Sequence, residues 1–478
     1  MNLNESSISK FIPRLNHKDL IIFLIPIAIF SYYLKVFDPG ILRYDSFNQL
    51  HQIATHSFTN WHPFFHTFIE MICLKIYSSP VSICILQILT FSVIWMVICK
   101  YNRQDDEKRF EKTFILQLLV TLAICLIPIN AIYSISLVKD ILFSYFLLLM
   151  CFMIKVLLDK KGNVGYGFII IMSLTMAFVA QLRPNGLYIV IPTLIILGIY
   201  LFKKNYNKTL LAIPVLAIIF ILLIASLNVA FDVEDNEKSA VLAKVSHMLA
   251  DYDLNLDLAE SDKDKIHALI DEKSIKDKYE ITYSDPIYAA SDKQVFHKNP
   301  WDYCLLAIKH SLYHPSHFIE YMSGSSPIVW DITRDDSWVG FQYKITLEED
   351  KNDYYGVHKS KPAADYDNAS SKNIGTDEYN ALHSISETFK NNIILDTLFN
   401  SPALYMYLAL IIMVLIHLIT KSKEIYLLYL PNLFNIFAIF VSTPIQDNRY
   451  LYPNLLVCYL LIIILISVIA QKGLKNRL

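Results

Sequence analysis

The residue most able to do chemistry is Asp45, which stands in a polar stretch near the start of the chain, residues 38–49 (DPGILRYDSFNQ). A semi-buried carboxylate there could act as a general base that takes a proton from a hydroxyl or an amine. Aspartate is also a common helix N-cap, and the run 46–56 that follows could be helical. The sequence leaves both roles open, and we predict the catalytic one.

Two histidines follow in the stretch 60–67 (NWHPFFHT). His62 and His66 are four residues apart, so they share one face if the segment is helical. With Asp45 they could ligate a metal ion. They could equally contact an acceptor through hydrogen bonds, or simply lie at the membrane interface, so the sequence does not decide whether a metal is needed. Pro63 suits the first turn of a helix, which makes Asn60 the expected N-cap.

Four basic residues stand in short links between apolar segments, and each needs a partner at the membrane edge. An arginine fork matches phosphate oxygens, so one phosphate or pyrophosphate of a lipid could serve all four. The alternative is separate snorkelling to lipid headgroups. The predicted phosphate-binding residues are Arg43, Lys139, Arg183 and Arg449. The residues predicted to position the acceptor or the loop are Tyr44, Gln49, Asn60, His62, His66, Asp140, Asn185 and Tyr450.

The apolar residues, 54% of the 478, come in blocks long enough to cross a bilayer as helices, with the charges confined to the gaps. This pattern predicts an all-α polytopic membrane protein of about ten spans. A shorter apolar segment, 63–77, carries charges and is expected to lie at the interface. The predicted spans are 20–36, 79–99, 113–132, 141–158, 166–182, 187–202, 209–230, 401–420, 425–442 and 454–470.

The basic gaps fall on one side of the membrane if ten segments span it, which places both termini in the cytoplasm. The first outer loop, 37–78, and a large acidic region then lie outside. We therefore predict three parts: a membrane module over 1–230 with spans one to seven, a mainly helical extracytoplasmic domain over 231–397, and a membrane segment over 398–478 with spans eight to ten.

Several kinds of site have no counterpart in the sequence. There is no Walker loop, no dinucleotide glycine fingerprint, no Gly-x-Ser-x-Gly and no Cys-x-x-Cys, so no nucleotide cofactor is expected. No basic face for nucleic acid is present either. The seven cysteines show neither zinc spacing nor a disulfide framework.

The order of parts resembles the GT-C superfamily of membrane glycosyltransferases, which includes protein O-mannosyltransferases, oligosaccharyltransferases and lipid A aminoarabinose transferases. Asp45 matches the acidic motif of their first outer loop, and His62-Pro63 matches a second motif roughly 20 residues later. The segment 63–77 matches their interfacial helix. The amino-acid sequence around Asp45 and His62 also resembles that of a set of uncharacterised bacterial multi-spanning proteins.

The resemblance implies a glycosyltransferase of the cell envelope. A polyprenyl-phosphate-linked sugar would enter from the outer leaflet, basic residues would hold its phosphate, and Asp45 would activate a glycan or protein acceptor for an inverting transfer. Three departures stand out. The usual pair of adjacent acids is reduced to Tyr44-Asp45, which puts a metal in doubt, one proline follows the histidine instead of two, and the large outer region precedes span eight.

Two other functions fit the same sequence. A transporter or flippase of lipid-linked envelope precursors would use the outer domain as a platform for partners. Such proteins usually carry inverted repeats or polar residues at mid-membrane, whereas the polar residues here gather at the outer edge. A polymerase or ligase of lipid-linked polysaccharides would differ mainly in the pyrophosphate and the glycan of its donor.

Overall fold

The computed structural model of the protein describes residues 15–103, 107–235, 237–333, 373, 375–442, 444 and 446–472. Over these ranges the regular structure is helical, and β-type pairing is confined to three isolated bridges. The fold is that of an all-α polytopic membrane protein, as the sequence predicts. The termini before residue 15 and after residue 472 lie outside the described residues.

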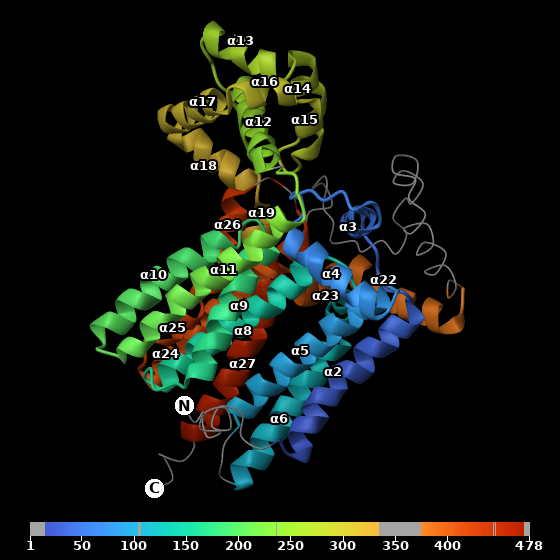
Figure 1. Cartoon of the computed structure of the whole chain (residues 1–478), viewed down its shortest axis with the longest axis vertical. Coiled ribbons are helices and arrows are strands. Elements are labelled where there is room, and N and C mark those ends of the chain that lie inside the picture. Colours follow the sequence, from blue (N-terminus) through green and yellow to red (C-terminus); the bar gives the residue numbers. More distant parts are fainter. Residues whose placement is uncertain are drawn as a thin grey trace.

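Apolar helices build one bundle (Figure 1). Within the described ranges six helices are long and apolar enough to cross a membrane, or seven if a pair bent by 71° counts as one span, and three apolar helices are shorter. All ten predicted segments coincide with helices in this set. The first part comprises α2 (His17–Val36), α3 (Tyr44–Thr55), α4 (Phe64–Ile76), α5 (Val81–Tyr101), the bent pair α6 (Glu107–Leu126) and α7 (Pro128–Ser134), α8 (Lys139–Asp159), α9 (Tyr166–Leu182), α10 (Leu187–Lys203), η1 (Lys208–Leu211) and α11 (Ala212–Ala230). The second part comprises α22 (Asp377–Asn391), α23 (Ile393–Asn400), α24 (Pro402–Thr420), α25 (Ile425–Leu428), α26 (Leu430–Val441), η2 (Asn448–Leu451) and α27 (Tyr452–Lys472).

The short helix α4 forms where an interfacial helix is predicted. Its 13 residues reach about 20 Å, well short of the roughly 30 Å of hydrocarbon in a bilayer. The details of its start differ from the sequence-based expectation. Pro63 is itself the N-cap and Phe64 the first helical residue, so the predicted cap at Asn60 is wrong. The backbone N–H of Asn60 instead donates to the carbonyl of Glu234, 2.8 Å away, and ties the first loop to the segment after α11.

Helix α8 is the centre of the bundle. Of its apolar window, 83% is buried inside the protein, against 17% for the peripheral span that ends at Ala230. The segment before α8 is fixed to the first loop, since Ile41 N–H donates to Ile135 O and Leu137 N–H donates to Ile41 O. The Ser46 hydroxyl also donates to Leu137 O. These bonds place the start of α3 beside the first turn of α8.

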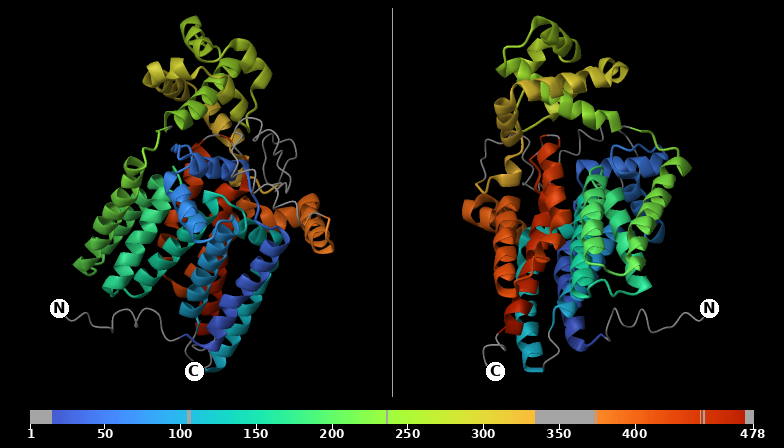
Figure 2. Two further views of the ribbon diagram at one scale, coloured as in Figure 1. Left: turned by 45° about the vertical axis from the view of Figure 1, so that its right-hand side comes forward. Right: turned by 90° about the vertical axis from the view of Figure 1, so that its left-hand side faces the viewer.

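A separate group of helices covers one end of the bundle, as Figures 1 and 2 show. We call α12–α18 the cap. The cap has its own apolar core, with Leu249, Tyr252, Ile266 and Phe296 all fully buried. It lies within the predicted 231–397 region, of which 334–372 lie outside the described residues. Its helices are α12 (Glu237–Asn255), α13 (Glu260–Leu269), α14 (Glu272–Lys278), α15 (Asp285–Ala290), α16 (Lys293–Lys298), α17 (Pro300–Tyr313) and α18 (Pro315–Gly324), followed by α19 (Pro327–Trp330), which packs on the bundle.

One side chain, Gln446, makes several of the hydrogen bonds that join the bundle to the cap and to α19. The Gln446 amide donates to Thr282 O (3.2 Å) and to Ser325 O (2.9 Å), and its carbonyl accepts from Ile328 N–H (3.2 Å). Because Gln446 is fully buried and stands two residues before η2, the cap is held next to that turn.

The tight turn between α9 and α10 depends on Gly186. A Cβ atom there would lie 2.1 Å from Val179 O and 2.8 Å from Ala180 Cα, both in the backbone. We expect Gly186→Ala to destabilise the protein by about 1–3 kcal/mol, because the two helices must separate. Gly198→Ala in α10 is the matched control, since no described atom lies within 4 Å of that added Cβ, and alanine there should be neutral or stabilise by about 0.5–1 kcal/mol. Thermal unfolding of the detergent-solubilised variants measures both, and equal effects at the two glycines would contradict the prediction.

Candidate functional site

An ionic network lies at the end of the bundle that the cap covers. Arg449 is its hub, because its guanidinium contacts three carboxylates from distant parts of the chain. Arg449 Nη1 lies 3.1 Å from Asp45 Oδ2, and Nε lies 3.5 Å from Asp140 Oδ2 and 2.8 Å from Asp447 Oδ2. The side chains of Asp140 and Asp447 are fully buried, whereas that of Asp45 is 17% exposed. Asp45 is therefore the carboxylate of this network that solvent reaches.

Asp45 lies in the first turn of α3, and Arg43 takes the N-cap position, so the alternative that Asp45 caps this helix is wrong. Its carboxylate contacts Lys139 Nζ at 3.2 Å in addition to Arg449. Burial raises the pKa of Asp45, but the charges of Arg449 and Lys139 outweigh burial and hold that pKa well below its usual range. Asp45 is consequently ionised at neutral pH, paired with two cations.

The remaining predicted cations join the same network. Arg183 Nε lies 3.1 Å from Asp140 Oδ1, and Arg183 Nη1 donates to Tyr450 O at 3.3 Å. The Tyr450 ring contacts two guanidinium groups, with its centroid 4.6 Å from Arg183 and 5.2 Å from Arg449. Arg43 Nη1 lies 3.3 Å from Asp447 Oδ2. The four basic residues predicted from separate links thus share three carboxylates, and the network carries one more positive than negative charge.

The two histidines follow one another on one side of the network, and His62 contacts Lys139 directly. Lys139 donates to His62 Nδ1 at 3.1 Å, and the Gln49 amide donates to His66 Nδ1 at 3.0 Å. Burial and the charge of Lys139 lower the pKa of His62 to about 4 and that of His66 to about 3, so both imidazoles are neutral at pH 7. These bonds use the Nδ1 atom of each ring, and His66 Nε2 is buried without a hydrogen-bond partner among the described residues. Among the described residues no group of three or more His, Cys, Asp or Glu side chains is arranged as a metal site.

Glu70 extends this side of the network beneath His66. Its carboxyl is fully buried, and Oε1 lies 3.5 Å from His66 Nδ1. Burial raises the pKa of Glu70 well above its usual value, which favours the protonated form. A neutral acid beside a neutral imidazole adds no charge near Lys139.

Three predicted positioning residues have different outcomes. Asn185 follows Arg183 closely, and its amide atoms are buried without a hydrogen-bond partner among the described residues. Gln49 is fully buried and also donates to Thr67 Oγ1 at 2.9 Å. The backbone of Tyr44 opens α3, but its side chain lies outside the described part of the structure.

The sequence was also compared with known proteins. Residues 52–301, more than half of the chain, match the model of a family described as a family of unknown function (DUF6020). The chain belongs to this family. The match covers His62, Lys139 and Arg183 together with most of the cap, whereas Asp45 and Arg449 lie outside the matched range. The DUF6020 description assigns no activity, and no curated protein and no solved structure matches the chain.

Sequence reasoning about this DUF6020 protein missed one member of the network. In the sequence Asp447 is only part of a polar link. In the structure its carboxylate contacts Arg43 and Arg449, and its Oδ1 also accepts the backbone N–H of Arg449 at 3.1 Å. Its spacing of two residues before Arg449 is the available signal, because an aspartate at that spacing can cap the turn that presents the arginine.

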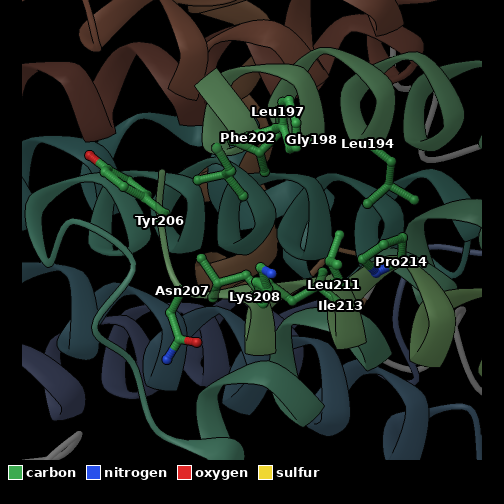
Figure 3. Close-up of a pocket in the computed structure, with 12 residues that line it drawn as sticks. Leu194, Leu197, Gly198, Phe202, Tyr206, Asn207, Lys208, Leu211, Ile213 and Pro214 are labelled. Carbon is green, nitrogen blue, oxygen red and sulfur yellow. The ribbon is translucent and has the colours of Figure 1, made fainter. Parts of the chain in front are cut away.

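A pocket elsewhere in the DUF6020 protein has a different character. Figure 3 shows it where the end of α10 meets η1, with Leu197, Phe202 and Leu211 among its mainly apolar lining residues. These residues lie at the end of α10 away from Arg183 and thus far from the ionic network. The lining holds no carboxylate or histidine that could act as a base, so we place the candidate site at the network.

Proposed function

We propose that the protein is a membrane glycosyltransferase that moves a sugar from a polyprenyl-phosphate-linked donor to a glycan or protein of the cell envelope. The observation that carries the proposal is the shared network, in which a solvent-accessible Asp45 pairs with Lys139 and Arg449 at a helix end beneath the cap. The phosphate of a lipid-linked donor lies at the membrane surface, so the cations that bind it must lie at the same level. The acceptor needs a base beside these cations to take its proton.

We propose further that all ten apolar segments span the membrane, with the network on the outer face and both termini in the cytoplasm. The opposite end of the bundle supports this orientation. There Tyr101 OH donates to Asp159 (3.1 Å), Tyr200 OH donates to Glu424 (2.5 Å), and Lys100 contacts Asp19 (3.2 Å), so the ends of several helices meet at one level. The lysines at 160–161, 203–204 and 421–423 lie at this end of the bundle, which favours the cytoplasmic side.

The cations would hold the phosphate that leaves the sugar. Arg449 and Arg183 offer planar forks for its oxygens, and Lys139 adds a point charge. In the structure these groups are balanced by carboxylates, and Asp45 is the one that is open to solvent. A donor phosphate would therefore compete with Asp45 for Lys139 and Arg449.

This competition would activate Asp45. Once phosphate oxygens engage Lys139 and Arg449, the cations that hold the pKa of Asp45 low are partly neutralised, and its affinity for a proton rises. The acceptor oxygen then forms a bond to the anomeric carbon, and its proton passes to Asp45. The bond from that carbon to the phosphate oxygen breaks, and its electron pair stays on the phosphate.

The test of the function uses the full chain in lipid nanodiscs with radiolabelled polyprenyl-phosphate hexoses, N-acetylhexosamines and pentoses. We expect one donor class to be consumed, and we expect a strain that lacks the gene to lose that sugar from its envelope glycans. An unchanged envelope composition, together with no consumption of any donor, would overturn the proposal.

Competition between Asp45 and phosphate makes a separate prediction. Asp45→Asn removes the negative charge that competes for Lys139 and Arg449, so affinity for undecaprenyl phosphate should rise by about ten-fold, equivalent to roughly 1.4 kcal/mol. Direct binding of the labelled lipid to the purified protein measures this change. Asp232→Asn is the matched control, because Asp232 is an exposed acid at the same end of the bundle with φ +49°, a conformation that asparagine tolerates. An affinity that falls or stays the same in Asp45→Asn would contradict the competition.

A further inference from the structure

An aromatic surface formed by Trp61 and Tyr288, which we call the shelf, lies where the cap meets the first loop. The ring of Trp61 stacks on Tyr288 of α15, with centroids 5.9 Å apart and planes 23° apart. Trp61 remains 43% exposed, which is unusual for the side chain that joins two parts of a protein. Lys293 Nζ lies 4.9 Å from the centroid of the Tyr288 ring. Residues of the cap therefore hold the shelf in place, and the Trp61 ring still presents an aromatic surface to solvent.

The shelf adjoins the ionic network by two independent routes. Along the first loop, His62 follows Trp61 directly and accepts from Lys139, which contacts Asp45. Across the cap, Ser284 N–H donates to Pro444 O at 3.1 Å, and Gln446 holds Thr282 directly before Asp447. Helix α15 is thus held at two points, at its start near η2 and at Tyr288 near His62. It therefore connects the two segments on either side of the network, η2 and the first loop.

Asp285 is the charged residue at the start of this bridging helix. It is exposed to solvent, and it stands three residues before Tyr288, so the two side chains share one face of α15. Partial removal of the carboxyl from water raises the pKa of Asp285, and the negative charge of Asp45 raises it further, whereas a hydrogen bond with Tyr283 lowers it. The electrostatic interaction between Asp45 and Asp285 agrees with the two connections described above, which place the start of α15 on the side of the network that faces the cap.

We propose that Trp61, Tyr288 and Asp285 form the acceptor subsite and bind a sugar ring of a glycan, an inference that rests on the proposed function. The exposed ring of Trp61 offers a flat apolar surface for the C–H face of a pyranose. The Asp285 carboxylate accepts hydrogen bonds from neighbouring hydroxyls. An aromatic plane with a carboxylate at its edge suits a ring that has one apolar face and a polar rim, whereas an extended peptide would need a row of backbone partners.

The subsite is tested by saturation-transfer NMR with the full chain in lipid nanodiscs, free of sugar-headed detergent. The probes are the methyl glycosides of glucose, mannose, galactose and N-acetylglucosamine at millimolar concentration. We expect at least one glycoside to bind, with affinity lowered about ten-fold or more in Trp61→Ala and in Asp285→Asn. Trp301→Ala and Asp302→Asn are matched controls, because both residues are exposed in the cap on α17. Absence of binding by every probe, or equal loss in the control variants, would overturn the subsite.

Turnover separates this inference from the proposed function. With donor and an acceptor glycan, the Trp61 and Asp285 variants should raise KM for the acceptor about ten-fold, whereas the Trp301 and Asp302 controls should leave that KM unchanged. If no donor is consumed by any variant, the proposed function fails. If the wild type consumes donor and the variants leave KM for the acceptor unchanged, the subsite alone fails. Transfer to a peptide with no effect of these variants would also reject the glycan subsite.

Discussion

Replacing Asp45 by asparagine is expected to lower sugar transfer by about 10²–10⁴-fold, the range that loss of a general base produces. The amide keeps the size of the side chain but cannot take the acceptor proton. Because the amide is uncharged, it no longer competes for Lys139 and Arg449. Their affinity for phosphate should therefore rise, and the donor should bind at least as tightly. A fall in kcat without a rise in KM for the donor is the expected pattern.

The structure allows this variant to fold. Asp45 is the exposed acid of the network, and Asp140 and Asp447 still neutralise Arg449 in its absence. Membrane insertion and the elution profile of the solubilised protein should match the wild type and the Asp232→Asn control. Normal transfer by well-folded Asp45→Asn protein would remove Asp45 from catalysis and leave it a purely structural partner of two cations.

The helices and the four cations could be predicted because their signals are local. Blocks of apolar residues give spans, and a basic residue in a short link is visible without knowledge of the fold. Asp45 and Lys139 are also adjacent to apolar blocks, so their level in the membrane follows from sequence. The bounds of helix α4 are predicted to within a residue at each end, because the length of the helix is fixed by the apolar run.

The pairing within the site could not be predicted. Asp45, Asp140 and Asp447 meet at Arg449 from three distant segments, and only the packing of α8 beside α3 and η2 brings them together. The same limit applies to Asp285, because its place in the cap relative to the first loop cannot be inferred from the sequence. The helix N-caps could not be predicted for a more local reason. Arg43, and not Asp45, is the N-cap of α3, and the Ser46 hydroxyl accepts the backbone N–H of Arg43 at 3.0 Å.

Removal of Arg449 is expected to have the largest effect on stability. In Arg449→Met the buried carboxylates of Asp140 and Asp447 each keep a single cation, Arg183 and Arg43 respectively. Breaking a buried ion pair from one side costs about 3–5 kcal/mol, because a charge is left under-compensated. We expect a clear fall in the midpoint of thermal unfolding, measured by size-exclusion of heated, solubilised protein. Lys35→Met, which removes an exposed cation from the end of α2, should leave the midpoint unchanged.

A second substitution separates the structural role of Arg449 from its proposed chemical role. Arg449→Lys keeps a positive charge among the three carboxylates but lacks the planar fork, so it should keep part of the stability that Arg449→Met loses. The recovered protein still lacks the guanidinium that would hold the donor phosphate, so transfer should remain low while the fold returns. If transfer recovers together with stability, a positive charge at position 449 is sufficient, and the planar fork of Arg449 is not what holds the phosphate.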